Sequence, residues 1–143
     1  MFLKVTSSYL LKDGLIFNFG EANILIDIYS DRGFNKKLKV HLINCKDSTP
    51  KGRNTFSFTP SNYDILIGRN HKQCQIKLSP NDKLLSNVQS SICFRSGAWF
   101  IRDGYKNKSS TNGTWMYLKE PTALENGHIL KANHTIFDVN IYS

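Results

Sequence analysis

The chain has 143 residues, of which 40% are hydrophobic, 12% aromatic and 21% charged, and its formal net charge at pH 7 is +8. This length fits one compact domain and leaves no room for two well-cored ones, while the composition excludes disorder over most of the chain. The positive charge favours an anionic partner, but it does not distinguish nucleic acid, acidic lipid and phosphorylated protein.

The first predicted elements are two apolar runs, "GLIFNFG" and "NILIDIYS", joined by the turn-forming "GEAN". No basic leader with a long apolar run precedes them, so we expect no secretory signal. We interpret residues 1–37 as a β-rich N-terminal extension, either an extra hairpin at the edge of the domain or an arm. This extension is also a possible interface between two copies of the chain in a homodimer.

From residue 38 onward, short runs that alternate apolar and polar residues predict β-strands. Clusters of Gly, Pro, Asn, Asp and Ser separate the runs roughly every 8–12 residues, and no long amphipathic helix is present. This spacing predicts an all-β sandwich or barrel. The predicted strands are Leu38–Ile43, Thr55–Thr59, Asp64–Gly68, Gln75–Leu78, Ser91–Arg95, Ala98–Asp103, Thr114–Leu118 and Ile136–Ile141.

Cysteine and histidine spacing argues against a disulfide framework and a metal site. Cys45, Cys74 and Cys93 are odd in number and widely spaced, which favours reduced thiols in a reducing compartment. The four histidines form no H-x-H or H-x-x-x-H group, and no apolar run approaches the roughly 18 residues of a membrane span. We therefore expect no metal, no cofactor and no membrane contact, and a location in the cytosol or the nucleus.

The sequence contains no motif that would support catalysis. A G-x-S-x-G nucleophile elbow, a G-x-x-x-x-G-K-[ST] phosphate loop and an H-E-x-x-H zinc motif are all absent. Serine, histidine and aspartate are present, but a nucleophile without an identifiable base and oxyanion donors is not a catalytic site. We therefore predict that the protein is not an enzyme.

Three separated stretches, "IGRN", "LSNVQ" and "STNGTW", place small polar or cationic residues at predicted strand ends. Loops at one end of a β-sandwich cluster in space, so these stretches could converge. Arg69 would supply a planar charged fork, while Ser86 and Thr111 would supply hydroxyl donors. Asn87 and Asn112 would add amides. Such a set suits a single phosphate group better than a long polyanion.

The order of these stretches resembles that of the forkhead-associated (FHA) domain, a phosphothreonine-peptide reader. The resemblance is carried by "DILIGRNHKQCQIKL", "LSNVQSSICF", "WFIRD", "STNGTW" and "LENGHILKANHTIFDVNI", most of the chain. It implies an FHA domain over residues 38–143, with a β-sandwich of two twisted, mainly antiparallel sheets and ligand loops at one end. The "SN" and "STNGTW" forms are most similar to FHA domains of DNA-damage checkpoint kinases, which slightly favours the nucleus.

The resemblance implies an adaptor that binds a phosphothreonine-containing protein, and it assigns roles to individual residues. Selectivity in the family often falls on the third residue after the phosphothreonine. The residues with implied roles are Arg69, Ser86, Asn87 and Thr111 for the phosphate, Asn112 for the peptide main chain, Lys83, Leu84, Tyr105 and Lys106 for specificity, and Gly68, Gln89, Gly113 and Thr114 for loop structure.

The sequence departs from the family pattern at two places. Gln89 stands where the family usually has a histidine that buttresses the loops, and we expect the Gln89 amide to take over that role. The change bears on loop rigidity more than on phosphate contact. The loop from Asp103 to Asn112 is also longer than usual, and its basic insert "YKNK" would either extend the peptide groove or cover it.

Two other functions stay open at this point. A phosphate-independent scaffold or dimerisation module on the same fold would use a sheet face and the N-terminal extension. A nucleic-acid binder would fit the +8 charge, but the sequence lacks the expected aromatic-plus-basic platform on adjacent strands. The chain ends directly at the last predicted strand, "VNIYS", as one module of a longer protein would.

Overall fold

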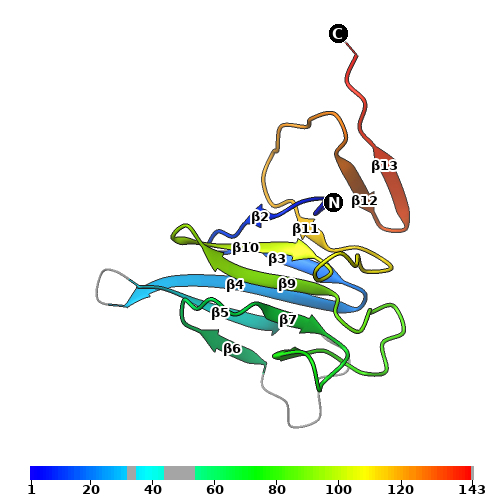
Figure 1. Ribbon diagram of the computed structural model, residues 1–143. Coiled ribbons are helices and arrows are strands. Elements are labelled where there is room, and N and C mark those ends of the chain that lie inside the picture. The colour runs from blue at the N-terminus through cyan, green and yellow to red at the C-terminus, as the bar shows by residue number, and fades with distance from the viewer. Residues whose placement is uncertain (32–34, 44–53, 143) are drawn as a thin grey trace.

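The structure, a computed structural model, describes residues 1–31, 35–43 and 54–142, which form thirteen β-strands and their connections (Figure 1). Within these ranges there is no helix of the length and apolarity needed to cross a membrane. The all-β prediction is confirmed. In chain order the strands are β1 (Phe2–Lys4), β2 (Tyr9–Leu10), β3 (Ile16–Phe19), β4 (Ala22–Asp31), β5 (Asn35–Ile43), β6 (Thr55–Phe58), β7 (Ile65–Gly68), β8 (Ile76–Lys77), β9 (Ser90–Arg95), β10 (Ala98–Asp103), β11 (Trp115–Tyr117), β12 (Ile129–Ala132) and β13 (Thr135–Asp138).

The strands form two sheets that pack as a sandwich. The larger sheet has the order β13-β12-β1-β11-β3-β4-β5-β6, and the smaller has the order β2-β10-β9-β7-β8. Among the described strands the pairing of β7 with β8 is parallel and the others are antiparallel. The two mainly antiparallel sheets expected from the sequence are therefore present.

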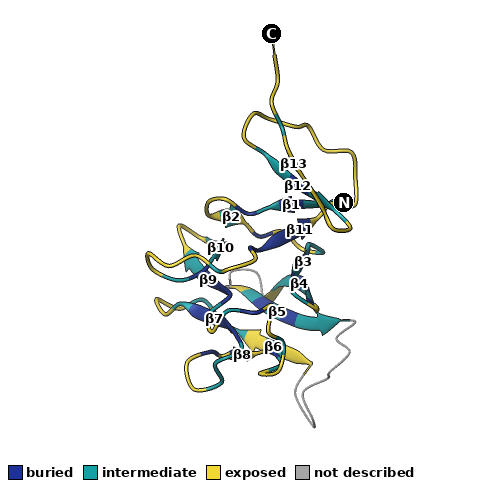
Figure 2. Ribbon diagram, turned by 90° about the vertical axis from the view of Figure 1, so that its right-hand side faces the viewer, coloured by how far each residue is buried: buried dark blue, intermediate teal, exposed yellow. Residues whose placement is uncertain are grey.

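The core lies between the sheets and is built from alternate residues of their inner faces. In β3, Phe17 and Phe19 are fully buried, while their neighbours in the strand are partly exposed. The smaller sheet contributes Ile67 from β7 and Trp99 and Ile101 from β10. Figure 2 shows buried positions along β7 and β9 of this sheet and along β11 of the larger one. Each large apolar side chain buried in this way stabilises the fold by about 1.5–3 kcal/mol, which gives the loops at the sheet ends a rigid base.

Of the N-terminal strands, β1, β3 and β4 lie inside the larger sheet and the short β2 lies at the edge of the smaller one, so the β3–β4 hairpin is neither an edge addition nor an arm. β1 pairs with both β11 and β12, and β3 lies between β11 and β4. β4 then pairs with β5 along its length, from Asn23↔Ile43 to Asp31↔Asn35. These strands are interior because their buried faces supply core residues such as Phe17 and Ile24. The domain boundary predicted at residue 37 falls inside β5 and stays a prediction.

Three connections leave the smaller sheet at one end of the sandwich: residues 69–75 after β7, 78–89 before β9 and 104–114 after β10 (Figure 1). β9 pairs antiparallel with both β7 and β10. The start of β9 therefore lies beside the ends of its two neighbours. This strand arrangement brings the three polar stretches singled out in the sequence to the same edge.

Candidate functional site

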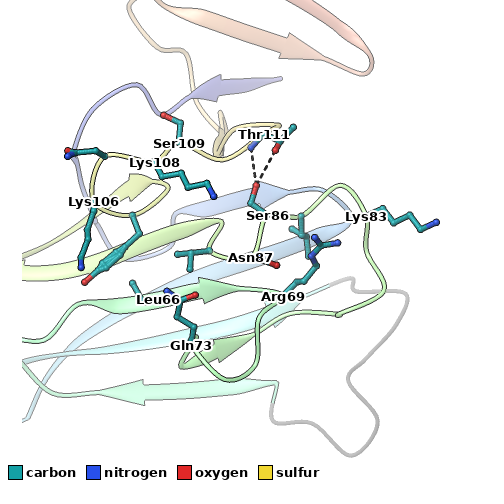
Figure 3. Close-up of a pocket in the computed structure, with 14 residues that line it drawn as sticks. Leu66, Arg69, Gln73, Lys83, Ser86, Asn87, Lys106, Lys108, Ser109 and Thr111 are labelled. Atoms are coloured by element: carbon teal, nitrogen blue, oxygen red, sulfur yellow. Dashed lines mark hydrogen bonds between the residues drawn. The ribbon is translucent and has the colours of Figure 1, made fainter.

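A cavity of about 830 Å³ opens between these three connections (Figure 3). Its lining extends in sequence from Leu66 to Thr111 and includes all four residues that the sequence suggested for phosphate binding. Three of the residues suggested for specificity line it too. The predicted residues that the structure brings together here are Arg69, Ser86, Asn87, Thr111, Lys83, Tyr105 and Lys106.

Ser86 joins the two loops that lie opposite Arg69. Its Oγ accepts a hydrogen bond from the Thr111 main-chain nitrogen at 3.0 Å and lies 3.5 Å from the Thr111 hydroxyl (Figure 3). The Arg69 main-chain nitrogen donates a hydrogen bond to the main-chain oxygen of Ser86 at 3.4 Å. All three loops therefore meet at one serine, with two hydroxyl groups at the cavity surface.

The Arg69 guanidinium faces this pair of hydroxyls across the cavity (Figure 3). Within the part of the chain that the structure describes, its side chain makes no hydrogen bond and no ion pair, and no carboxylate lines the cavity. A guanidinium fork without a counter-ion is a strong binding group for a phosphate or a carboxylate. The arrangement can therefore bind an anion.

Gly68 and Asn87 hold the Arg69 loop against the Ser86 loop. A Cβ atom at Gly68 would lie 2.2 Å from the Asn87 main-chain oxygen, so only glycine fits there. That oxygen accepts from the Asn70 nitrogen at 3.2 Å and from the Cys74 thiol at 3.3 Å. The main chain of Asn87 is thus fixed, while its exposed side chain is left to the cavity.

Gln89 lies fully buried beneath the loops and bridges them through its side-chain amide. Its Oε1 accepts from the Ser86 nitrogen at 2.9 Å, and its Nε2 donates to the Gly113 oxygen at 2.8 Å. Its main-chain oxygen accepts from the Gly104 nitrogen at 2.9 Å. One glutamine therefore ties together the loops that carry Ser86 and Thr111.

Asp103 organises the turn that carries Thr111, and the sequence interpretation missed it. Its carboxylate accepts from the Ser110 nitrogen at 3.0 Å, the Ser110 hydroxyl at 2.5 Å and the Thr114 hydroxyl at 2.8 Å. Thr114 is fully buried, and Gly113 takes a φ of +86°, which favours glycine. The available signal was an aspartate at a strand end shortly before the hydroxyl-rich "SSTNGT".

Asn112 and Leu84 lie outside the cavity lining. The Asn112 side-chain nitrogen donates to the Leu84 main-chain oxygen at 2.9 Å, so this amide ties the two loops together. The Asn112 main-chain oxygen accepts from the Trp115 indole at 2.8 Å. The Leu84 side chain is 51% exposed. The contacts suggested for these two residues, Asn112 with the peptide main chain and Leu84 with a specificity position, stay predictions.

The thiols and histidines that the structure describes are not grouped with other possible metal ligands. Among the described residues no group of three or more His, Cys, Asp or Glu side chains is placed to hold a metal ion. Cys74 and Cys93 are free thiols, and Cys45 lies outside the described residues. Burial raises the pKa of Cys74 from 9.0 to about 11, so this thiol is neutral at ordinary pH.

Aromatic and basic side chains gather on adjacent strands of the larger sheet, a cluster that the sequence interpretation missed. The Lys131 ammonium lies 4.5 Å from the Trp115 ring centroid and 5.6 Å from that of Phe2, and Lys4 lies 5.9 Å from Trp115. The strands involved, β12, β1 and β11, are neighbours. Trp115 is only 3% exposed, however, so its ring is not available for stacking with a base.

Comparison with known proteins identifies one family. The family model of the FHA domain matches residues 65–136, a range that contains the whole cavity lining. No curated protein and no solved structure matches the chain. FHA domains are generally phosphothreonine-binding protein-interaction modules, and typically they are not enzymes.

Proposed function

The chain belongs to the FHA-domain family, and we propose on this premise that it is a phosphothreonine-dependent protein-binding module acting as an adaptor in phosphorylation-controlled assembly. The observation that carries the proposal is the meeting of Arg69, Ser86, Asn87 and Thr111 in one cavity without a carboxylate. They come from three loops, so their convergence depends on the whole fold.

The chemistry of these groups fits a phosphate monoester. At neutral pH a phosphothreonine carries about −1.5 to −2 charges and three acceptor oxygens. The Arg69 fork would offset much of that charge through two parallel hydrogen bonds. The hydroxyls of Ser86 and Thr111 and the Asn87 amide would donate to the remaining oxygens. A carboxylate side chain has less charge and fewer acceptors, so this set favours the phosphate.

Titration with matched peptides tests the proposal. A library of phosphothreonine peptides and their unphosphorylated counterparts would be measured by fluorescence polarisation against the wild type and Arg69→Ala. Losing a charge-assisted pair costs about 1.5–3 kcal/mol, so affinity should fall roughly tenfold to over a hundredfold in Arg69→Ala. Arg95→Ala is the matched control, because this exposed arginine does not line the cavity. Equal binding of phosphorylated and unphosphorylated peptides would reject the proposal.

We also propose that the partner acts in the DNA-damage response in the nucleus. The support is the similarity of "SN" and "STNGTW" to the FHA domains of checkpoint kinases. The tagged protein should concentrate in the nucleus, and Arg69→Ala should lose any focus that forms after DNA damage. A wild-type protein that stays cytosolic before and after damage would contradict the proposed nuclear role and leave the proposed phosphothreonine binding untouched.

A further inference from the structure

The cavity has a second group of cations besides Arg69. Lys106 and Lys108, from the long loop after β10, line the wall opposite β7. Figure 3 shows the Lys108 side chain extending toward Ser86, whereas that of Lys83 points away from the cavity. Both lysines belong to the basic insert "YKNK", and the loop was expected to contribute to specificity, but the proposed phosphothreonine contacts use neither lysine.

The loop that carries the two lysines is held in place at its base. The Tyr105 and Lys108 main chains exchange hydrogen bonds of 3.0 and 3.1 Å, which close a tight turn around Lys106. A Cβ atom at Gly104 would lie 1.9 Å from the Lys108 oxygen, so the chain folds back as closely as glycine allows. The Gly104 nitrogen also donates a hydrogen bond to the Gln89 main-chain oxygen. The loop that carries the two lysines is therefore anchored to the same glutamine that holds Ser86 and the Thr111 turn.

Lys106 occupies the turn at a cost in backbone energy. Its φ is +55°, the left-handed region that glycine or asparagine would adopt more easily. Its ammonium lies 5.4 Å from the Tyr105 ring centroid, and Tyr105 also lines the cavity. The ring therefore keeps this lysine beside the cavity instead of leaving it to extend into solvent.

The size and charge of the cavity exceed what one phosphate needs. About 830 Å³ falls in the range of pockets that hold drug-sized ligands. Four basic residues line it, namely Arg69, Lys83, Lys106 and Lys108, of which Lys83 directs its side chain away, and no carboxylate is among the lining residues. Like charges gathered in one cleft repel each other and attract anions. A single phosphate, with about −1.5 to −2 charges, would leave part of this positive charge without a counter-ion.

We propose that Lys106 and Lys108 form a second anion-binding position, which takes a carboxylate or a phosphate elsewhere on the phosphothreonine peptide. The inference rests on the proposed function, because the peptide must first bind through its phosphothreonine. It names the ligand class more narrowly: a peptide with an acidic or a second phosphorylated residue near the phosphothreonine. The basic insert thereby extends the groove and does not cover it.

Peptide titrations against the intact chain test the second position. One phosphothreonine peptide without acidic residues serves as the reference, and a set of variants carries aspartate at each successive position on either side. A parallel set carries phosphoserine at those positions, which distinguishes a preference for carboxylate from one for phosphate. The unphosphorylated peptides measure phosphothreonine dependence separately.

The variant is Lys106→Gln/Lys108→Gln, which removes two charges and keeps side chains of similar length. The control is Lys12→Gln/Lys72→Gln, which removes the same charge from exposed lysines outside the cavity lining. The wild type and the control should bind one subset of the anionic peptides about five- to tenfold more tightly than the reference. In the variant that preference should vanish, so that the anionic peptides and the reference bind it with similar affinity.

The outcomes separate the two proposals. If phosphothreonine dependence holds but no anionic neighbour strengthens binding, or the variant keeps the preference, the second position is wrong and the proposed function stands. If the control loses the preference as fully as the variant, the effect is net charge and the second position is likewise wrong. If phosphorylation of the threonine makes no difference, both proposals fail.

Discussion

The Gln89 side-chain nitrogen donates to the Gly113 main-chain oxygen at 2.8 Å, a contact between residues 24 positions apart in a site from which solvent is excluded. The same amide accepts from the Ser86 nitrogen at 2.9 Å. An amide has a donor and an acceptor at its two ends, so one side chain satisfies a main-chain oxygen on one loop and a main-chain N–H on another.

Removing this amide should destabilise the domain. Gln89→Leu keeps similar bulk but leaves the Ser86 N–H and the Gly113 oxygen buried without a partner, at about 1–3 kcal/mol each. We expect the free energy of unfolding in urea to fall by about 2–4 kcal/mol. Gln73→Leu is the control, because this glutamine is exposed at the cavity. A Gln89→Leu variant as stable as the control would show that the bridge does not hold the loops.

Gly68→Ala should disrupt the junction of the Arg69 and Ser86 loops. The new methyl would lie 2.2 Å from the Asn87 main-chain oxygen, and a main-chain atom cannot rotate away as a side chain can. Forcing an atom into a packed site costs about 1–3 kcal/mol or more. Gly97→Ala provides the comparison, since Gly97 has a φ of +77° but open space around it. Thermal unfolding should show the larger loss for Gly68→Ala; the reverse order would contradict the steric explanation.

Asp103→Ala should loosen the turn that presents Thr111. The carboxylate accepts three hydrogen bonds from Ser110 and Thr114, and bonds to a charged group contribute about 1.5–3 kcal/mol. Unfolding stability should fall by roughly 2–4 kcal/mol, and phosphopeptide affinity should fall even at temperatures where the variant is folded. Calorimetric titration of the folded variant measures the second effect. Asp138→Ala, on the exposed strand β13, should change neither.

Cys74 should react slowly with thiol reagents in the folded state. The thiolate is the nucleophile, and burial raises the pKa of this thiol to about 11. Alkylation at about pH 8, followed by mass spectrometry of each cysteine peptide, should label Cys74 far more slowly in native than in urea-unfolded protein. Equal labelling in the two states would mean that the site is open.

The same shift gives stability a pH dependence with a definite sign. The folded-state pKa of Cys74 lies above the ordinary value of 9.0, so the unfolded chain loses this proton first as the pH rises. The stabilisation is fully present below pH 9 and declines as the pH rises toward 11. Cys74→Ala should lose stability less steeply across that interval in denaturant titrations.

Local patterns predicted the strands of the two sheets that alternate clearly. Leu38 and Val40 in β5 were expected on one face and are fully buried, and β10 was expected with its observed bounds, Ala98–Asp103. The polar stretches at the strand ends also converge, because β9 pairs antiparallel with β10, to which a two-residue turn joins it, and with β7 on its other side. These features depend on neighbouring residues, which a sequence displays directly.

Other features depend on contacts between distant segments, which alternation does not encode. β1 is only Phe2–Lys4, too short to show a period, yet it lies between β11 and β12. The N-terminal hairpin was therefore expected at an edge and lies in the interior. The position of Lys108 in the cavity follows from the fold of one loop and from Gly104, which no composition or spacing rule predicts.

The place of β1 has a consequence for how the protein is made. Leu3 pairs with Met116 on one side and Leu130 on the other, so both partners are synthesised more than a hundred residues after it. Pairings across such separations close large loops of chain and slow folding. The segment that forms β1 must wait, with its apolar side chains uncovered, until β11 and β12 have been synthesised. The time of greatest exposure to aggregation and to chaperones thus falls before the last two strands emerge.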